Sequence, residues 1–324
     1  MNKVFICPSN IKSKSEISIT GSKSESNRLL IINALYSNIE LLNLSNSDDT
    51  KVLTKALSNL NGQIDIHHAG TAMRFLTAFL AQIEDREFVI TGSARMQERP
   101  IGILVDSLNE LGFEVTYLDK KGFPPLKIIG KKNIKSEIKL NSTVSSQYIS
   151  ALMLIAPSFE NGLKIILEGQ IISKPYINLT LNILKKIGVK CSFKKNIIEI
   201  KNHSKSKISQ YTVESDWSSA SYFYSIVSLL DNVTIILSSF FDNSFQGDSI
   251  VSKIYESFGV NTTCKENTIC LTKMENYSKP DSLEFDLLEN PDLAQTISVT
   301  ALCMGIPLVL NGLQTLKIKE TDRI

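Results

Sequence analysis

Small and apolar residues recur along the 324-residue chain with a period of about 73 residues. Runs with the spacing of one helix face begin near Thr71, Ser145, Ser218 and Asp292. Each run is followed by a short β-branched segment, which predicts a strand. We expect these strands over residues 87–90, 163–167, 233–237 and 307–310.

A second, amphipathic helix is predicted after each of the first three strands, with a glycine at its end as is common for helix C-termini. These helices should cover residues 101–111, 177–187 and 250–258, and the glycines are Gly112, Gly188 and Gly259. Two alternating segments then predict a pair of strands, and a further strand leads into the next unit. Units of this length exceed the familiar solenoid repeats, so the pattern predicts small α/β subdomains.

The first and fifth units depart from this pattern. The first starts near Ser24 and lacks the strand pair, because only nine residues separate its glycine, Gly62, from Thr71. The fifth starts at Asp292, and the chain stops at Ile324, where its second helix should begin. We therefore expect a C-terminally truncated chain, in which apolar side chains of the fifth unit lose part of their cover. These side chains are Leu293, Ile297, Leu302, Leu308 and Leu310.

Bulk composition narrows the class of protein. The length favours two domains, and 43% hydrophobic with 21% charged residues is typical of soluble enzymes. A net charge of +2 argues against a nucleic-acid or membrane partner, and the longest apolar stretch, 297–310, is too short to cross a bilayer. Five cysteines without paired or metal-ligand spacing predict reduced thiols, a cytoplasmic location and no metal site. No GxGxxG follows a strand, so no dinucleotide cofactor is expected.

Arginine is scarce, with six residues against 29 lysines. Five of the six lie in short stretches rich in glycine or small polar residues: Arg28, Arg74, Arg95, Arg99 and Arg323. A planar guanidinium binds a carboxylate or phosphate through two parallel hydrogen bonds, which lysine cannot do. The pattern therefore predicts an anion site built from distant segments, with structural arginine–carboxylate pairing as the alternative.

Each unit's first helix starts with small polar residues, which we expect to be N-caps: Ser24, Thr71, Ser145, Ser218 and Asp292. Free N–H groups at such helix starts also suit an anion. Basic residues or an amide stand near most of them, namely Lys23, Arg28, Arg74, Gln147, Lys319 and Arg323. Acid–base candidates are Asp292, Glu320, Asp322 and a lysine such as Lys319, whose pKa the Arg323 charge can lower. Together these features indicate an enzyme for small, multiply anionic substrates.

Seven segments resemble the 5-enolpyruvylshikimate-3-phosphate synthase family. They are 21–28 (GSKSESNR), 69–74 (AGTAMR), 95–102 (RMQERPIG), 145–147 (SSQ), 173–177 (SKPYI), 291–292 (PD) and 319–323 (KETDR). The rival family, which acts on UDP-N-acetylglucosamine, typically has a Lys-Asn pair and a loop cysteine. This chain has Lys23-Ser24 instead, and the loop around Arg95 has no cysteine.

The resemblance implies an α/β fold of two domains, the inside-out α/β barrel of the enolpyruvyl transferases. The upper domain would cover residues 19–214 in three repeats, the first one shortened. The lower domain would combine 1–18 with 215–324 and be incomplete. The family is usually monomeric and uses neither a metal nor an organic cofactor.

The implied reaction transfers the carboxyvinyl group of phosphoenolpyruvate to the 5-hydroxyl of shikimate 3-phosphate, and phosphate is released. Shikimate 3-phosphate would contact Lys23, Ser24, Arg28, Ser145, Ser146, Gln147, Ser173, Asp292, Thr315 and Lys319. Phosphoenolpyruvate would contact Lys23, Gly70, Arg95, Gln147 and Arg323. The implied catalytic residues are Asp292 as base, Glu320 as proton donor, Lys319 and Lys23.

Three features differ from the family pattern. Phe75 stands where proline is common, and Thr315 stands where many members have asparagine, so inhibitor and substrate fit can change. Two further cationic ligands would lie beyond Ile324. The alternatives are therefore a non-catalytic fragment that only binds shikimate 3-phosphate, and a related transferase acting on a UDP-sugar.

Overall fold

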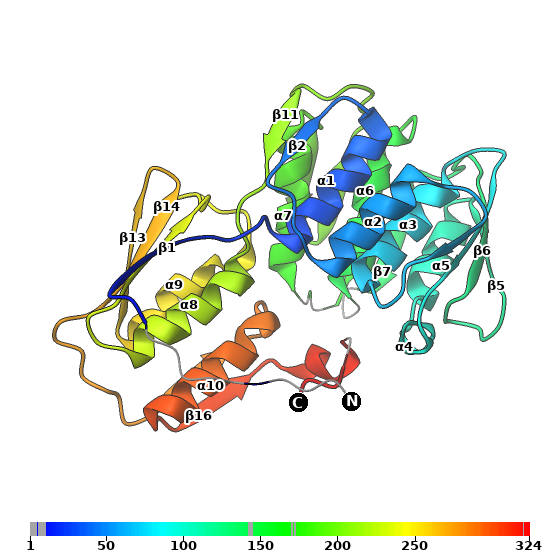
Figure 1. The fold of residues 1–324 in the computed structure, drawn as a ribbon. Coiled ribbons are helices and arrows are strands. Elements are labelled where there is room, and N and C mark those ends of the chain that lie inside the picture. The colour runs from blue at the N-terminus through cyan, green and yellow to red at the C-terminus, as the bar shows by residue number, and fades with distance from the viewer. Residues whose placement is uncertain (1–4, 6–10, 142–144, 170, 172, 320) are drawn as a thin grey trace.

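The computed structural model describes the chain except residues 1–4, 6–10, 142–144, 170, 172 and 320. Its buried apolar side chains form two separate clusters. One lies within residues 29–213, and the other joins Ile19 to residues 217–316. We call the parts around them the upper and the lower lobe, and Figure 1 shows them side by side.

Three four-stranded sheets share one strand order, as the repeat predicted. A leading strand runs parallel to the second, and the remaining two continue the sheet in antiparallel fashion. The upper lobe holds β3-β4-β6-β5 (Gln63–Asp65, Glu87–Thr91, Leu126–Ile129, Glu114–Tyr117) and β7-β8-β10-β9 (Glu137–Asn141, Leu163–Glu168, Ile197–Ile200, Cys191–Lys194). The lower lobe holds β1-β12-β14-β13 (Lys14–Ser18, Thr234–Ser238, Thr268–Lys273, Val260–Lys265).

Two smaller sheets belong to the units that depart from the pattern. In the first unit β2 (Glu40–Leu42) pairs in parallel with β11 (Gln210–Thr212). In the fifth unit β15 (Leu283–Asp286) pairs in parallel with β16 (Leu308–Asn311). The strand pair that sequence spacing excludes from the first unit is also missing from the described residues of that unit.

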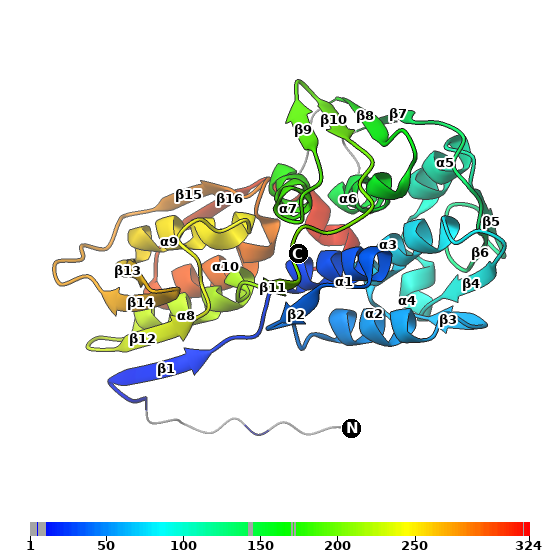
Figure 2. The ribbon, with the colours of Figure 1, turned by 90° about the horizontal axis from the view of Figure 1, so that it is seen from above.

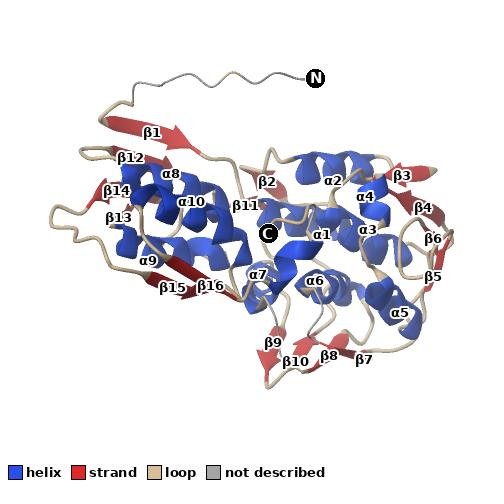
Figure 3. Ribbon diagram, turned by 90° about the horizontal axis from the view of Figure 1, so that it is seen from below, coloured by secondary structure: helices blue, strands red, loops and turns tan. Residues whose placement is uncertain are grey.

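Helices fill the middle of each lobe, and the sheets lie at the outside (Figures 2 and 3). The first helix of each unit is α1 (Lys23–Tyr36), α3 (Gly70–Ala81), α6 (Ser146–Ile155), α8 (Trp217–Leu229) or α10 (Ala294–Met304). The second is α2 (Asp48–Ser58), α5 (Gly102–Glu110), α7 (Lys174–Lys186) or α9 (Val251–Ile254). Short helices complete the set: α4 (Ala94–Gln97), η1 (Ala156–Ser158), η2 (Gly247–Ile250), η3 (Tyr255–Phe258), η4 (Pro291–Leu293) and η5 (Gln314–Ile318).

Glycine ends three of the second helices, as predicted: Gly112, Gly188 and Gly259 have φ of 104°, 105° and 78°. The single helix predicted over 250–258 is instead a succession of η2, α9 and η3. The segment is 3₁₀-helical at both ends and α-helical in the middle, and the apolar spacing alone does not distinguish these two types of helix.

The predicted N-caps are only partly correct. Ser145 caps α6, since its hydroxyl accepts the amide N–H of Gln147 at 3.3 Å. Helix α1 is capped by Ser22 rather than Ser24, and α8 by Asp216 rather than Ser218. Thr71 lies inside α3, which has no side-chain cap, and Asp292 lies inside η4. At the starts of α1 and α8, two polar residues could serve as the N-cap. In both helices the earlier residue is the cap, and the predicted residue lies in the first turn.

The expectation of lost cover in the fifth unit is wrong for two of its residues. Leu293 in η4 and Ile297 in α10 are fully buried, because both helices pack against α8. On the opposite side Leu302 is 79% exposed, and Leu308 and Leu310 are half-buried. Half of this unit's apolar face is therefore covered within the lower lobe.

Glu214 connects the lobes where the chain crosses between them. Its backbone carbonyl accepts the Ser22 amide at 2.8 Å from the other crossing segment. Its buried carboxylate accepts bonds from the lower lobe, including Trp217 Nε1 at 2.8 Å and Ser244 Oγ at 2.6 Å. A Cβ on Gly21 would lie 1.9 Å from the Asn43 carbonyl, so only glycine lets the segments approach this closely.

A second buried carboxylate, Glu25, lies beside Glu214. It accepts the Tyr211 hydroxyl at 2.7 Å and the Glu214 amide at 3.2 Å. Burial raises its pKa to about 7, and the Glu214 charge adds to the effect, although the Tyr211 bond opposes it. Glu25 therefore titrates near neutral pH at the connection between the lobes.

Glu25→Gln should change the pH dependence of stability. Because the folded-state pKa exceeds the ordinary value of 4.5, the folded protein binds the extra proton, and the free energy of unfolding falls as pH rises from about 4.5 to 7. The variant resembles the protonated side chain, so it should lose most of this fall. At pH 8 it should be more stable than the wild type by about 1–3 kcal/mol. Urea unfolding between pH 5 and 8 measures the effect, with the exposed Glu84→Gln as control. Equal pH slopes in all three proteins would contradict it.

Candidate functional site

Asp292 is the centre of a charged cluster between the lobes. Its Oδ1 accepts Arg323 Nη1 at 2.8 Å and lies 3.3 Å from Lys319 Nζ. Its Oδ2 accepts the hydroxyl of Tyr176 at 2.8 Å. Burial favours the neutral acid, but Lys319, the Tyr176 bond, Arg323 and Lys23 outweigh it and lower the pKa of Asp292 to about 2. The carboxylate is therefore ionised, and its side chain remains 23% exposed.

The cluster depends on contact between the lobes. Tyr176 lies in the first turns of α7, in the upper lobe, whereas Asp292 lies in η4 of the lower lobe. Beside them Gly247 faces Pro175, and a Cβ on this glycine would lie 2.4 Å from the Pro175 Cβ. Only glycine therefore permits this approach of α7 to η2.

Segments after β16 supply the cations of the cluster. Lys319 follows η5, and the Arg323 amide donates to the Leu316 carbonyl at 3.2 Å, which fixes this part of the chain. Thr315, in η5, has a buried hydroxyl oxygen without a hydrogen-bond partner among the described residues. Glu320, expected to donate a proton, lies outside the described residues.

A second group of predicted residues gathers at the start of α6. Ser145 caps this helix, Ser146 is buried in its first turn, and the Gln147 amide donates to the Thr71 hydroxyl of α3 at 3.3 Å. Gly70 begins α3, and a Cβ there would lie 2.3 Å from Arg99 Nη1. The starts of α3 and α6 thus converge, and both direct backbone N–H groups the same way, as anion sites require.

Arg28 is fully buried and binds protein oxygens. Its guanidinium donates to the hydroxyls of Thr180 and Ser150 at 2.7 and 3.1 Å, and to the carbonyls of Ser24 and Tyr176 at 2.7 and 3.2 Å. It also lies over the Phe75 ring, 5.3 Å from the centroid. Burial lowers its pKa to about 10. Arg28 therefore joins α1, α6 and α7, a use of arginine that neither sequence interpretation included.

The other predicted residues lie in different settings. Arg74 donates to the carbonyls of Gly70 and Pro100 at 3.1 and 2.9 Å. Arg95 pairs with Glu98 at 3.0 Å within α4 and keeps 44% of its side chain exposed. Ser173 precedes α7 with φ of 55°, an unusual conformation for a residue other than glycine, and its side chain is buried. Strain of this kind often accompanies binding sites.

The structure therefore unites Asp292, Lys319, Arg323 and Lys23, as the sequence indicated. Sequence reasoning assigned no role to Tyr176, although it lies in the quoted segment 173–177, nor to Asp248. Tyr176 contacts Asp292, and Asp248 contacts Asn290, and in each pair the two residues come from distant segments of the chain. The Asp292 carboxylate and its cations can bind an anionic substrate and move a proton.

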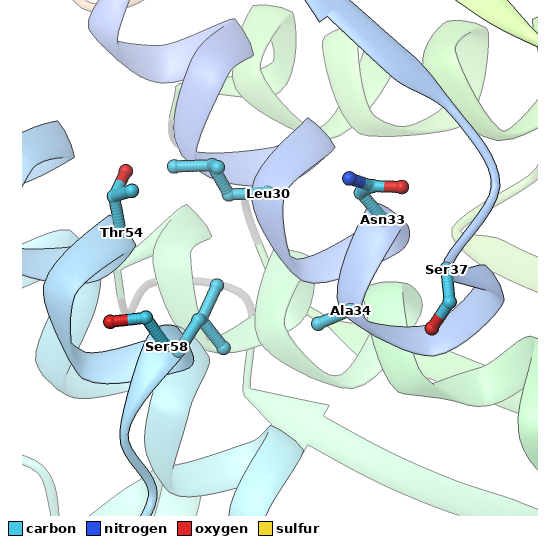
Figure 4. Close-up of a pocket in the computed structure, with 7 residues that line it drawn as sticks. Leu30, Asn33, Ala34, Ser37, Thr54 and Ser58 are labelled. Carbon is cyan, nitrogen blue, oxygen red and sulfur yellow. The ribbon is translucent and has the colours of Figure 1, made fainter.

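Three observations bear on other ligands. The described part of the chain contains no group of three His, Cys, Asp or Glu side chains arranged for a metal ion. None of its helices is both long and apolar enough to span a bilayer. Figure 4 shows a pocket of about 300 Å³ between α1 and α2, lined by Leu30, Asn33, Ala34, Ser37, Thr54, Leu57 and Ser58. No predicted site residue lines this pocket.

Comparison with known proteins identifies the family. Residues 61–324 match the family model described as EPSP synthase (3-phosphoshikimate 1-carboxyvinyltransferase). The 3-phosphoshikimate 1-carboxyvinyltransferase of Bacteroides fragilis is 46% identical over 325 residues, covering 100% of this chain and 78% of the relative. That of Colwellia psychrerythraea is 34% identical, covering 97% and 79%.

The fold is shared with solved structures. The 2.37 Å structure of EPSP synthase from Acinetobacter baumannii has a TM-score of 0.76 at 19% identity, covering 96% of this chain and 76% of that one. It supports the two-domain, inside-out α/β architecture, with helices inside and sheets outside. From its sequence relatives and its fold, the chain belongs to the EPSP synthase (3-phosphoshikimate 1-carboxyvinyltransferase) family.

Proposed function

We propose that the cluster around Asp292 is the place where the family's reaction occurs. That reaction transfers the carboxyvinyl group of phosphoenolpyruvate to the 5-hydroxyl of shikimate 3-phosphate. The observation that carries the proposal is a partly buried carboxylate that contacts two cations and a tyrosine hydroxyl from the other lobe. Such a site can neutralise both substrates and hold a proton acceptor near the reacting hydroxyl.

The chemistry divides into addition and elimination. In the addition, the 5-oxygen bonds to C2 of phosphoenolpyruvate, its proton passes to Asp292, and C3 takes a proton, which we assign to Glu320. In the elimination, C3 returns its proton to Glu320, the C2–O bond to phosphate breaks, and the departing phosphate takes the proton from Asp292. A carboxylate with a pKa of about 2 is a weak base. Anionic substrates would share Lys319 and Arg323, and this would raise the pKa of Asp292.

We assign the two substrates to neighbouring parts of this site. The phosphate of shikimate 3-phosphate would bind at the start of α6, where Ser145, Ser146, Gln147 and Ser173 offer donors. Its ring would contact Ser24, Arg28, Thr315 and Lys319. Phosphoenolpyruvate would lie near Gly70, Gln147, Arg95 and Arg323, and Lys23 would contact both substrates.

Organisation and location complete the proposal. We assign residues 19–214 to the upper domain and 1–18 plus 215–324 to the lower domain, although the side chain of Ile19 packs in the lower cluster. Their separate apolar clusters support this division. We also propose a cytoplasmic monomer without nucleic-acid or membrane partners, which the near-neutral charge of +2 supports.

The binding assignment predicts a split between two sets of variants. Ser146→Ala should weaken shikimate 3-phosphate binding by about 1–3 kcal/mol, since it removes a donor to an anion. Arg95→Ala should leave this binding unchanged and weaken phosphoenolpyruvate instead. Calorimetry with each substrate measures both effects. If Ser146→Ala bound shikimate 3-phosphate as tightly as the wild type, the phosphate would have to lie elsewhere.

The catalytic assignment predicts a loss of turnover. Asp292→Asn should lower kcat by about 10²–10⁴, as expected for an acid–base group, while shikimate 3-phosphate still binds. Phosphate release gives the rate, and calorimetry gives the binding. Wild-type kcat in Asp292→Asn would disprove the role of this residue. A wild-type chain that binds shikimate 3-phosphate but releases no phosphate would support the non-catalytic alternative.

A further inference from the structure

Asp248 is a buried carboxylate beside the cluster that the reaction scheme does not use. It lies in η2, is 6% exposed, and forms no ion pair within the described chain. Its recorded hydrogen-bond partners are neutral: Asn290 Nδ2 donates at 3.0 Å, and the Ser218 hydroxyl donates to the other oxygen. Burying a charge without a cation is costly, and an asparagine could bridge the same two partners. The charge itself therefore calls for an explanation.

Asn290 links Asp248 to the turn that carries Asp292. The Asn290 carbonyl accepts the Leu293 amide at 3.2 Å and so closes the turn of η4 around Asp292. Its amide N–H donates to the Leu287 carbonyl at 3.0 Å. The backbone of Asn290 is therefore hydrogen-bonded through both its carbonyl and its N–H. The bond from its side chain to Asp248 then fixes the orientation of this turn relative to α7. Gly247, next to Asp248, is where η2 contacts Pro175 of that helix.

Electrostatics gives the Asp248 charge an effect on Asp292. The groups that face Asp248 are Asp292 from η4, Asp216 before α8, and Tyr176 from α7. Burial raises the pKa of Asp248 to about 6, and the Asp292 charge contributes next. This coupling is reciprocal, so while Asp248 is ionised it favours a proton on Asp292. The effect of the Asp248 charge on Asp292 is opposite to that of Lys319 and Arg323, which make Asp292 a weak base.

We propose that Asp248 is a positioning residue for the carboxyvinyl transfer: its carboxylate holds Asn290, and thereby the turn of Asp292, and its negative charge makes Asp292 a stronger base. The inference rests on the assignment of Asp292 as the base. Ionised Asp248 is the active form, so kcat should rise with pH through the titration of this group.

The first test is the pH profile of phosphate release. Asp248→Asn should lower kcat about tenfold at pH 7, change the KM for shikimate 3-phosphate little, and lose the rise of kcat near pH 6. Asn290→Ala should lower kcat but keep that rise, because the charge remains. The control is Asp242→Asn, which removes an exposed charge from the segment before η2 and should match the wild type. An unchanged profile in Asp248→Asn, or equal losses of kcat in Asp242→Asn, would overturn the proposal.

The second test does not depend on turnover. Carbon-13 NMR of aspartate-labelled protein should show one carboxyl titrating near pH 6 that is missing from Asp248→Asn. In Asp292→Asn this titration should move to lower pH by about one unit, because the neighbouring charge is gone. No movement would refute the coupling even if the chain has no activity. Wild-type kcat in Asp292→Asn, together with the shifted titration, would instead refute the role of Asp292 as base and retain the coupling.

Discussion

The partly buried carboxylate of Asp292 imposes the main constraint on this structure. A charge removed from water must be matched by cations and hydrogen-bond donors, or it would be protonated. Here the donors come from two places: Lys319 and Arg323 lie after η5, and Tyr176 lies at the start of α7. The two lobes must therefore meet at α7 and η4 for the site to exist. Gly247 permits the close contact of η2 with α7, and the hydrogen bond between Ser22 and Glu214 joins the two segments that cross between the lobes.

The repeat is the part of the fold that the sequence predicted best. Its period depends on many apolar positions at once, so an error at one position does not disturb it. The first helices and central strands appear within a few residues of their predicted bounds, and three sheets share one strand order. The short leading strands had no predicted bounds. β3 spans only Gln63–Asp65 and alternates too briefly to be recognised. Such strands form because a neighbouring strand pairs with them, and local sequence does not record this.

Sequence analysis named charged residues of the site. It did not predict their hydrogen bonds to neutral groups. Scarce arginines indicated an anion site, with arginine–carboxylate pairing as the alternative, and Arg323 pairs with the carboxylate of Asp292. Arg28, however, binds carbonyl and hydroxyl oxygens of three helices. A sequence shows that a guanidinium is present but not which oxygens surround it. Tyr176 and Asp248 were missed for a related reason, because each acts on a residue 116 or 42 positions away.

The charges around the reacting group have to satisfy opposing requirements. Binding two multiply anionic substrates calls for several cations, and the same cations weaken a carboxylate as a base. Desolvation raises the pKa of Asp292, but these cations and the hydrogen bond from Tyr176 together lower it to about 2. A nearby anion reduces this conflict, since its charge favours a proton on Asp292. Asp248 is buried behind the turn of η4, bound to Asn290, and meets that requirement. On this argument, the burial of an unpaired carboxylate costs stability but contributes to the basicity that the transfer needs.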